Sequence, residues 1–224
     1  MRSKRAEWMC PGRTSAASRV RGLYAVTPDS DDTDALVAKV AAAIEGGAAI
    51  VQYRNKTSSP QVRRSQAQAL AKACKDHDAL LIVNDDPKLA HEVAADGVHV
   101  GADDGDIAQA RAIVGDDRIV GVSCYDDFQR ACHAVSMGAD YVAFGSFFAS
   151  SVKPGACRAN VELLHRGRAL RVPLVAIGGI TSANAKMLVD AGASAVAVIS
   201  DVFAHEDLSQ VKRSAAAIAA LFPQ

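Results

Sequence analysis

From residue 22 onward, the sequence alternates short aliphatic or β-branched runs with longer stretches of helical pattern. Successive runs start about 17 to 33 residues apart, which is the span of one βα unit. We therefore predict eight strands, at 23–27, 49–54, 80–84, 97–100, 119–123, 141–144, 174–177 and 195–199. Helices are predicted between and after them, at 34–45, 60–78, 87–94, 106–114, 126–137, 161–169, 184–191 and 208–221.

This alternation favours a (β/α)8 barrel, or TIM barrel, whose usual length of about 200–250 residues suits a chain of 224. A doubly wound sheet is the alternative, but it needs a GxGxxG turn after its first strand, which the segment YAVTPDSDD lacks. Half of the residues are hydrophobic, which is enough for a sizeable core. Glycines in EGGA, SMGAD and DAGAS predict left-handed helix ends. We predict one α/β barrel domain over residues 22–224.

Charge and cysteine content narrow the class of protein. The 25 basic and 25 acidic residues cancel, so there is no electrostatic basis for binding nucleic acid. No run approaches 18 uninterrupted apolar residues, so we expect no membrane-spanning helix. Five cysteines without a CxxC spacing indicate reduced thiols rather than disulfides or a zinc site, and hence a cytoplasmic protein. The sequence is compatible with a homo-oligomer and does not set the number of subunits.

The first 21 residues differ in composition from the rest. They carry six basic residues and one acidic residue, so 19 basic and 24 acidic residues remain after them, a net charge of −5. They lack the apolar core of a secretory signal. A transit peptide rich in Arg and Ser is one interpretation. We favour a disordered tail over residues 1–21, with Met9 as another candidate initiator.

In a TIM barrel the functional groups lie at the C-terminal ends of the strands, so those positions can be searched directly. At the second predicted strand, period-two alternation puts Gln52 and Arg54 on the inward face and Val51 and Tyr53 on the outward face. A glutamine and an arginine inside a barrel are costly unless a ligand meets them. A solvated strand end is the alternative.

Acidic residues follow the third and fourth predicted strands. Asp86 is best interpreted as the cap of the next helix, whereas Asn84 and Asp85 end the third strand. Asp103 and Asp104 follow the fourth strand, and capping is the alternative for them. Carboxylates at neighbouring strand ends converge over a barrel mouth. Two oxygen ligands from separate loops, completed by water and phosphate, suit Mg²⁺.

Further polar residues stand on the middle strands. Ser123 ends the fifth strand and is expected to donate one hydrogen bond to a ligand. No neighbouring His–Asp arrangement supports a hydrolase nucleophile at Ser123 or Cys124, and Cys124 is interpreted as a small hydrophobe. Lys153 follows the sixth strand on a run of small residues, with a surface lysine as the alternative. His99 is interpreted as a hydrogen-bonded core residue rather than a ligand.

The segments after the seventh and eighth strands predict a phosphate site. Barrels often bind phosphate between these two loops, on backbone N–H groups and the N-terminus of a short helix. Gly179 permits a close backbone approach, and residues 201–203 are predicted to form the short helix. Together with the Mg²⁺ site across the mouth, two anionic sites face one another, which favours a transferase.

The motifs VQYRNK, LIVNDD, DGVHVGADD, IVGVS, FGSFFASSVKPGA, AIGGIT and AVAVIS occur in this order, after YAVTP. This ordered set resembles the thiamine-phosphate synthase family over about residues 22–200, although IGGIT alone is common in barrels. The resemblance implies joining of 4-amino-5-hydroxymethyl-2-methylpyrimidine diphosphate to a thiazole monophosphate, with release of pyrophosphate.

The resemblance also implies roles for single residues. Contacts to the pyrimidine diphosphate are implied for Gln52, Arg54, Lys56, Asn84, Ser123 and Lys153. The implied catalytic residues among these are Arg54, Ser123 and Lys153. The implied Mg²⁺ ligands are Asp85 and Asp104. Contacts to the thiazole phosphate are implied for Ser150, Val152, Gly179, Ile199 and Ser200.

The loop after the sixth strand departs from the family's usual Thr-x-Thr-Lys. It reads Ser150-Ser151-Val152-Lys153, so the first hydroxyl is kept and the second is lost, which affects the expected affinity for thiazole phosphate. The implied chemistry needs no general base, because the attacking thiazole nitrogen carries no proton. Mg²⁺, Arg54 and Lys153 would neutralise the departing pyrophosphate.

Two other functions stay open on the same fold. A thiazole tautomerase would need the monophosphate pocket alone, and a non-catalytic regulator that binds thiamine phosphate would need no Mg²⁺ ligands. The presence of Arg54, Asn84, Asp85, Asp104 and Lys153 favours the synthase. The sequence does not say whether the thiazole substrate carries an extra carboxylate.

Overall fold

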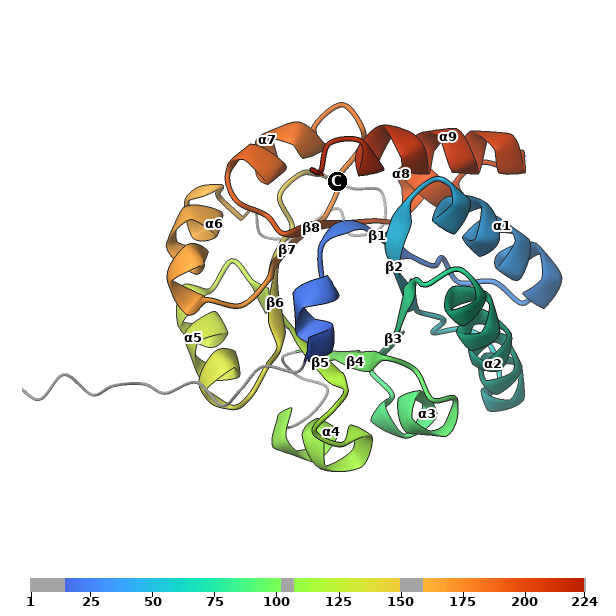
Figure 1. The fold of residues 1–224 in the computed structure, drawn as a ribbon, viewed down its shortest axis with the longest axis horizontal. Coiled ribbons are helices and arrows are strands. Elements are labelled where there is room, and N and C mark those ends of the chain that lie inside the picture. Colours follow the sequence, from blue (N-terminus) through green and yellow to red (C-terminus); the bar gives the residue numbers. More distant parts are fainter. Residues whose placement is uncertain (1–14, 102–106, 150–158, 224) are drawn as a thin grey trace, which may run out of the picture.

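Eight parallel strands close into a barrel in their sequence order in the computed structural model, which describes residues 15–101, 107–149 and 159–223 (Figure 1). The prediction of a (β/α)8 barrel is confirmed, and each strand end lies within two residues of its predicted position. The strands are β1 (Gly22–Val26), β2 (Ala48–Tyr53), β3 (Leu80–Asn84), β4 (Gly97–Val100), β5 (Ile119–Tyr125), β6 (Tyr141–Gly145), β7 (Leu174–Ile177) and β8 (Ala195–Val198).

Helices surround the barrel in Figure 1. The expected extra turn after β8 is present as α8 (Ser200–Phe203). A 3-10 turn, η2 (Arg168–Leu170), follows α6. Within the described ranges, no helix is both long and apolar enough to cross a membrane. The other helices are α1 (Thr33–Glu45), α2 (Pro60–Asp76), α3 (Pro87–Glu92), α4 (Ile107–Val114), α5 (Phe128–Ser136), α6 (Glu162–Gly167), α7 (Ala185–Asp190) and α9 (Leu208–Ala219).

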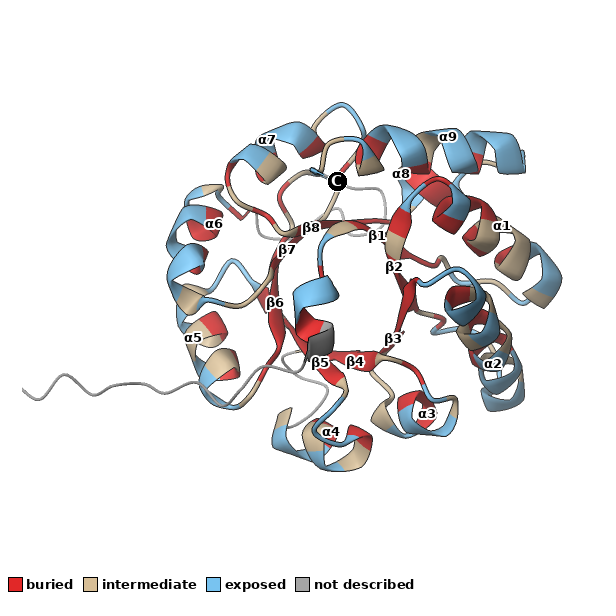
Figure 2. Cartoon of the chain, viewed as in Figure 1, coloured by how far each residue is buried: buried red, intermediate tan, exposed pale blue. Residues whose placement is uncertain are grey.

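Alternation along the strands divides the apolar side chains into two cores. Ile50 belongs to the cluster inside the barrel, whereas Val51 and Tyr53 belong to the larger cluster between strands and helices. Gln52 follows the same parity as Ile50 and is buried inside the barrel, as predicted. Figure 2 shows the result, with buried strands and with helices that are buried on one side and exposed on the other.

Three loops enter their strands with the same hydrogen-bonding arrangement. A short polar residue precedes β4, β6 and β8, and its side chain accepts a hydrogen bond from a backbone N–H of the preceding strand. The side-chain bonds join Asp96 to Leu81 at 2.8 Å, Asp140 to Val120 at 2.9 Å and Ser194 to Leu174 at 3.1 Å. The backbone N–H of each polar residue also donates to the carbonyl of the same partner. The repeated Gly-Ala-Asp-like segments of the sequence therefore fix strand register.

The N-terminal end of the barrel is closed by η1 (Ser15–Arg19), which lies across the barrel in Figure 1. Ala17 and Val20 are 0% and 1% exposed, and Val20 packs with the cluster inside the barrel. Arg19 donates to the carbonyl and the carboxylate of Asp78 at 2.9 and 2.8 Å. Residues 17–20, which the sequence placed in the tail, therefore pack at the barrel base through these two apolar side chains. Residues 1–14 lie outside the described residues.

Candidate active site

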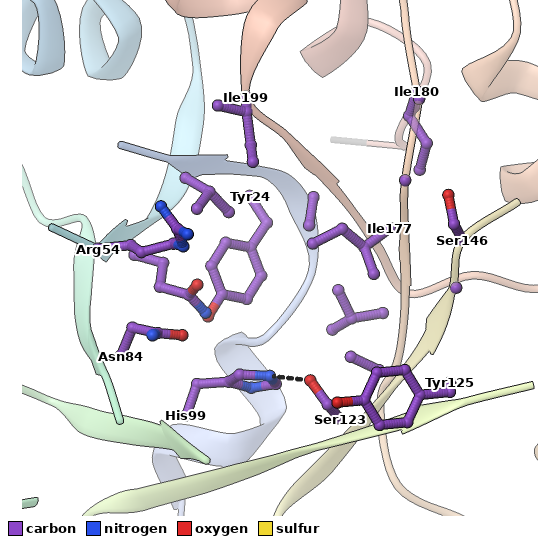
Figure 3. A pocket seen from close by; sticks show the side chains of 18 of the residues that line it. Tyr24, Arg54, Asn84, His99, Ser123, Tyr125, Ser146, Ile177, Ile180 and Ile199 are labelled. Atoms are coloured by element: carbon purple, nitrogen blue, oxygen red, sulfur yellow. Dashed lines mark hydrogen bonds between the residues drawn. The ribbon is translucent and has the colours of Figure 1, made fainter. Parts of the chain in front are cut away.

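A cavity of about 900 Å³ lies at the C-terminal ends of the strands. This volume is typical of sites for small molecules. Residues from the strand ends and the loops that follow them line it, and Figure 3 shows Arg54 and Asn84 on one side, with Ile180 and Ser146 on the other. The side chains of Tyr24 and His99 extend into its interior from the strands in Figure 3. Tyr141 on β6 also lines the cavity.

The guanidinium of Arg54 is oriented by the loop after β1. Its Nη1 lies 3.3 and 3.2 Å from the two carboxylate oxygens of Asp29. Asp29 also accepts a hydrogen bond from the backbone N–H of Lys56 at 2.7 Å. The buried hydroxyl of Thr27 accepts from the N–H of Arg54 at 2.9 Å and donates to its carbonyl at 3.0 Å. The end of β1 therefore fixes both the backbone and the charged group of Arg54.

Asn55 anchors the loop that carries Arg54 and Lys56. Its amide donates to the carbonyl of Ser30 at 2.6 Å and to the hydroxyl of Ser58 at 2.8 Å. Its carbonyl oxygen accepts the backbone N–H of Ser58 at 3.2 Å. Asn55 is only 6% exposed, so it stabilises the loop while its two neighbours face the cavity.

Asp85 joins the loops after β2 and β3. Its Oδ2 lies 3.2 Å from Nζ of Lys56 and accepts a hydrogen bond from the amide of Asn84 at 2.6 Å. Its φ of 61° lies in the left-handed region, which is uncommon for residues other than glycine, and its N–H donates to the carbonyl of His99 at 2.8 Å. Asp86, in contrast, caps α3 as predicted and accepts the N–H of Leu89 at 2.9 Å.

Asp85 fits the predicted role of a Mg²⁺ ligand. Its partly exposed carboxylate lines the cavity, supplies hard oxygen atoms and already faces one cation, the ammonium of Lys56. No group of three or more His, Cys, Asp or Glu side chains suited to a metal occurs in the part of the chain that the structure describes. Mg²⁺ commonly binds through one or two carboxylates together with water and substrate phosphates, which matches this sparse donor set. The second predicted ligand, Asp104, lies outside the described residues.

The loops after β6 and β7 approach one another closely at Gly178 and Gly179. Both glycines have positive φ angles, 104° and 63°. A Cβ at Gly178 would lie 2.6 Å from Cα of Ser146, and one at Gly179 would lie 2.9 Å from the carbonyl carbon of Phe148, so neither position accepts a side chain without rearrangement. At Gly179 the group that lies close is protein backbone, and the predicted close approach of a phosphate to this glycine stays a prediction. The same side of the cavity is lined by Gly179, Ile199 and Ser200.

Ser123 on β5 lies beside His99 on β4, as Figure 3 shows. His99 Nε2 and Ser123 Oγ are 2.8 Å apart, and His99 Nδ1 lies 2.8 Å from the hydroxyl of Tyr141. In a Ser-His-Asp triad, a carboxylate contacts Nδ1 of the histidine, whereas here the hydroxyl of Tyr141 occupies that position. Burial lowers the pKa of His99 to about 4 and raises that of Cys124 to about 12. The predictions of a hydrogen-bonded core histidine and a hydrophobic cysteine are therefore confirmed.

The cavity brings together nine of the predicted site residues. These are Gln52, Arg54, Lys56, Asn84, Asp85, Ser123, Gly179, Ile199 and Ser200. Four others lie outside the described residues, namely Asp104, Ser150, Val152 and Lys153. Convergence on one cavity is what a shared site requires, and the individual roles of these residues stay predictions.

Several residues of the cavity were not found from the sequence. Tyr24 and Tyr141 face inward with the parity of their strands, so the alternation that located Gln52 was also the signal for them. Asp29 lies in a loop without periodicity, and no sequence signal pairs it with Arg54. At the rim, the guanidinium of Arg130 lies 5.2 Å from the ring centroid of Tyr125.

Comparison with known proteins gives a consistent result. A family model described as thiamine monophosphate synthase matches residues 23–202. The thiamine-phosphate synthase of Azoarcus sp. (strain BH72) is 52% identical over 205 residues, which cover 91% of this chain and 98% of that protein. The thiamine-phosphate synthase of Methylobacillus flagellatus is 51% identical over 189 residues, which cover 84% of this chain and 90% of that protein.

Solved structures agree with the sequence comparison. The thiamine phosphate pyrophosphorylase from Pyrococcus furiosus superposes with a TM-score of 0.78 at 32% identity, covering 89% of this chain and 94% of that one. A 3-hexulose-6-phosphate synthase superposes with a TM-score of 0.67 at 20% identity, a likeness of fold alone.

Proposed function

The chain belongs to the thiamine monophosphate synthase family, and from this premise we propose that its cavity holds the pyrimidine diphosphate beside β2 and β3 and the thiazole phosphate beside β7 and β8. Membership makes the protein a transferase of thiamine biosynthesis, which condenses the two substrates to thiamine monophosphate and releases pyrophosphate. The proposal concerns which residues perform each part of that reaction.

One observation carries the assignment of the diphosphate side. Arg54 and Lys56 line one side of the cavity and come from a single loop, with Asn84 and Asp85 beside them. A diphosphate needs several positive or hydrogen-donating groups within a few ångströms, and this cluster supplies a guanidinium, an ammonium and an amide. On the other side, the backbone at Gly179 and the hydroxyl of Ser200 suit the smaller charge of a monophosphate.

The proposed reaction begins with cleavage of the bond between the pyrimidine methylene carbon and the bridging oxygen. The electron pair leaves with pyrophosphate, and the aminopyrimidine ring stabilises the positive charge left on the methylene carbon. The thiazole nitrogen then supplies its lone pair to that carbon, which forms the new C–N bond. Arg54 and Lys56 stabilise the charge that develops on pyrophosphate, and no proton has to be removed from the nitrogen.

Mg²⁺ would be held by Asp85 and by Asp104, with phosphate oxygens and water completing its shell. When bound, the ion neutralises negative charge on the diphosphate and favours its departure. Lys153 is proposed to add a further positive charge on the leaving side, and Ser150 and Val152 are proposed to meet the thiazole phosphate. These three residues and Asp104 lie outside the described residues.

The location of the enzyme is proposed from its thiols. Cys74, Cys124 and Cys132 are all free in the described part of the chain. Unpaired cysteines are typical of a reducing compartment, which supports a cytoplasmic location. The partners proposed are the two small-molecule substrates, and a homo-oligomer stays a prediction.

The proposal is tested with the purified full chain and both substrates. Pyrophosphate release should require the pyrimidine diphosphate, the thiazole phosphate and Mg²⁺ together, and should stop when any one is omitted. Isomerisation of a thiazole phosphate without the diphosphate would instead identify a tautomerase. Binding of thiamine phosphate without turnover would identify the regulator.

A further inference from the structure

Five polar side chains from five strands form one hydrogen-bonded chain inside the barrel. Gln52 Nε2 lies 2.9 Å from the hydroxyl of Tyr24, which lies 2.8 Å from the hydroxyl of Tyr141. The Tyr141 hydroxyl lies 2.8 Å from Nδ1 of His99, and Nε2 of His99 lies 2.8 Å from Oγ of Ser123. We refer to these residues as the Gln52–Ser123 chain. Its last link is drawn in Figure 3, and both of its ends line the cavity.

Every interior member of the Gln52–Ser123 chain is neutral near pH 7. Tyr24, Tyr141 and His99 are 1%, 0% and 7% exposed. Burial raises the pKa of both tyrosines above the usual value and lowers that of His99 to about 4. A neutral imidazole donates from one nitrogen and accepts at the other, and each hydroxyl has one proton to give. Each tyrosine hydroxyl can therefore donate to only one of its two neighbours, which leaves the direction of donation along the chain to be set by its ends.

The amide of Gln52 sets that direction. Its Nε2 has only protons to offer, so the Tyr24 oxygen accepts, and the Tyr24 proton goes to Tyr141. Tyr141 in turn donates to Nδ1 of His99, which leaves the imidazole proton on Nε2 and directed at Ser123. The reverse direction would leave the Tyr24 proton without an acceptor among the described residues, at a cost in a buried site.

We propose that Tyr141 and His99 are positioning residues that make Ser123 a hydrogen-bond donor to the substrate. Because Ser123 Oγ accepts the Nε2 proton of His99, its own proton is free to point into the cavity. An isolated serine can turn its hydroxyl either way, whereas diphosphate oxygens can only accept. The proposal rests on the proposed function in one respect, because it takes the pyrimidine diphosphate as the ligand that Ser123 meets.

The tautomer of His99 is tested without any substrate. The ring nitrogens of the six histidines are observed by ¹⁵N NMR of the full chain at pH 7, and the His99 signals are identified by their loss in His99→Gln. We expect a neutral ring protonated at Nε2 only. A ring protonated at Nδ1 would overturn the proposal, because Ser123 would then have to donate to His99. This result is independent of whether the protein turns over any substrate.

The effect on turnover is tested by a double-mutant cycle with Ser123→Ala and Tyr141→Phe. If Tyr141 acts through Ser123, Tyr141→Phe should lower kcat/KM by about tenfold or more with Ser123 present. The same substitution should change kcat/KM by less than about twofold in the Ser123→Ala background. Equal losses in the two backgrounds would give Tyr141 a merely structural role and would overturn the proposal.

Tyr53→Phe is the matched control. The Tyr53 hydroxyl is also buried and donates to Oε1 of Gln66 at 2.8 Å, but Tyr53 belongs to the outer core between strands and helices. This substitution removes one buried tyrosine hydroxyl bond outside the cavity, so kcat/KM should stay within about twofold of wild type. A wild-type protein without pyrophosphate release would contradict the proposed function and leave the NMR result to decide the tautomer.

Discussion

Asp29, in the loop after β1, holds the guanidinium of Arg54, with both carboxylate oxygens within 3.3 Å of one guanidinium nitrogen. The same carboxylate accepts the backbone N–H of Lys56. One acidic side chain thus orients the guanidinium of Arg54 and fixes the backbone of Lys56, two residues that are proposed to bind the diphosphate. A carboxylate beside an anion site repels the ligand, so its presence there favours a positioning role that offsets this cost.

Asp29→Asn should therefore lower kcat more than it changes KM. Its amide oxygen can still accept the Lys56 N–H, but the charge that orients Arg54 is lost, and the guanidinium is then less well placed for the charge of the leaving group. We expect kcat to fall about tenfold and KM for the pyrimidine diphosphate to change less than about threefold. Asp34→Asn in the first turn of α1 removes the same charge outside the cavity and serves as control. An unchanged kcat in Asp29→Asn would contradict the positioning role.

Asp85→Asn should abolish most activity without disturbing the fold. Asparagine tolerates the left-handed φ of 61° observed at this position, whereas alanine would add backbone strain to the result. We expect turnover to fall by about 10²-fold or more, the scale of losing a preorganised charged partner. The Mg²⁺ concentration that gives half of the remaining maximal activity should be higher than in the wild type.

Asp86→Asn is the matched control for Asp85→Asn. Asp86 accepts the N–H of Leu89 as the cap of α3, and asparagine caps helices equally well. Its activity and Mg²⁺ dependence should match those of the wild type. Normal Mg²⁺-dependent turnover in Asp85→Asn would remove the metal-ligand assignment.

Val20→Ala should destabilise the protein, because Val20 is buried in the base of the barrel. Removing two buried methyl groups from a packed site costs about 1–3 kcal/mol of unfolding free energy. For a domain of this size, each kcal/mol corresponds to about 2–4 °C in Tm, which calorimetry or circular dichroism detects. Arg19→Ala breaks only an exposed ion pair with Asp78 and should cost less than about 1 kcal/mol. Equal Tm values for Val20→Ala and wild type would show that the packing of Val20 at the barrel base does not contribute to stability.

Acidification should destabilise the fold through His99. Its pKa is about 4 in the folded protein and 6.5 ordinarily, so between these values the unfolded chain binds a proton that the folded chain does not. The free energy of unfolding should therefore fall as pH drops through this window, by about 2–3 kcal/mol from this group at pH 4.5. Denaturant titrations at pH 7 and pH 4.5 should give a smaller loss for His99→Gln than for wild type. Equal losses would mean that His99 is not the titrating group.

The sequence predicted the strands and the inner face of β2 because both depend on local periodicity. Ile50 and Gln52 face inward and Val51 faces outward, as alternation requires, whatever the rest of the fold does. The same locality explains Asp86, whose capping role depends only on the residues that follow it.

Contacts between distant segments could not be predicted in this way. The pair Asp29–Arg54 joins residues 25 positions apart, and His99–Ser123 joins residues 24 positions apart. Both pairs depend on strand register and on the tilt of neighbouring strands, which no local pattern encodes. The η1 segment was missed for a different reason. Ala17 and Val20 are too few to form a periodic pattern, although each is buried completely or nearly so.

The closed base of the barrel also bears on the order of events in one catalytic cycle. With Val20 packed beneath the interior cluster, ligands of the cavity reach solvent on the side of the strand C-termini. Both substrates and both products must then pass through the same opening of the cavity. A ligand bound deep in the cavity, against Tyr24 and Tyr141, cannot dissociate while another ligand occupies that opening. The deeper substrate should bind first and the deeper product should leave last. Product-inhibition patterns should accordingly follow a compulsory order, and a random-order pattern would mean that the ligands pass one another at the mouth.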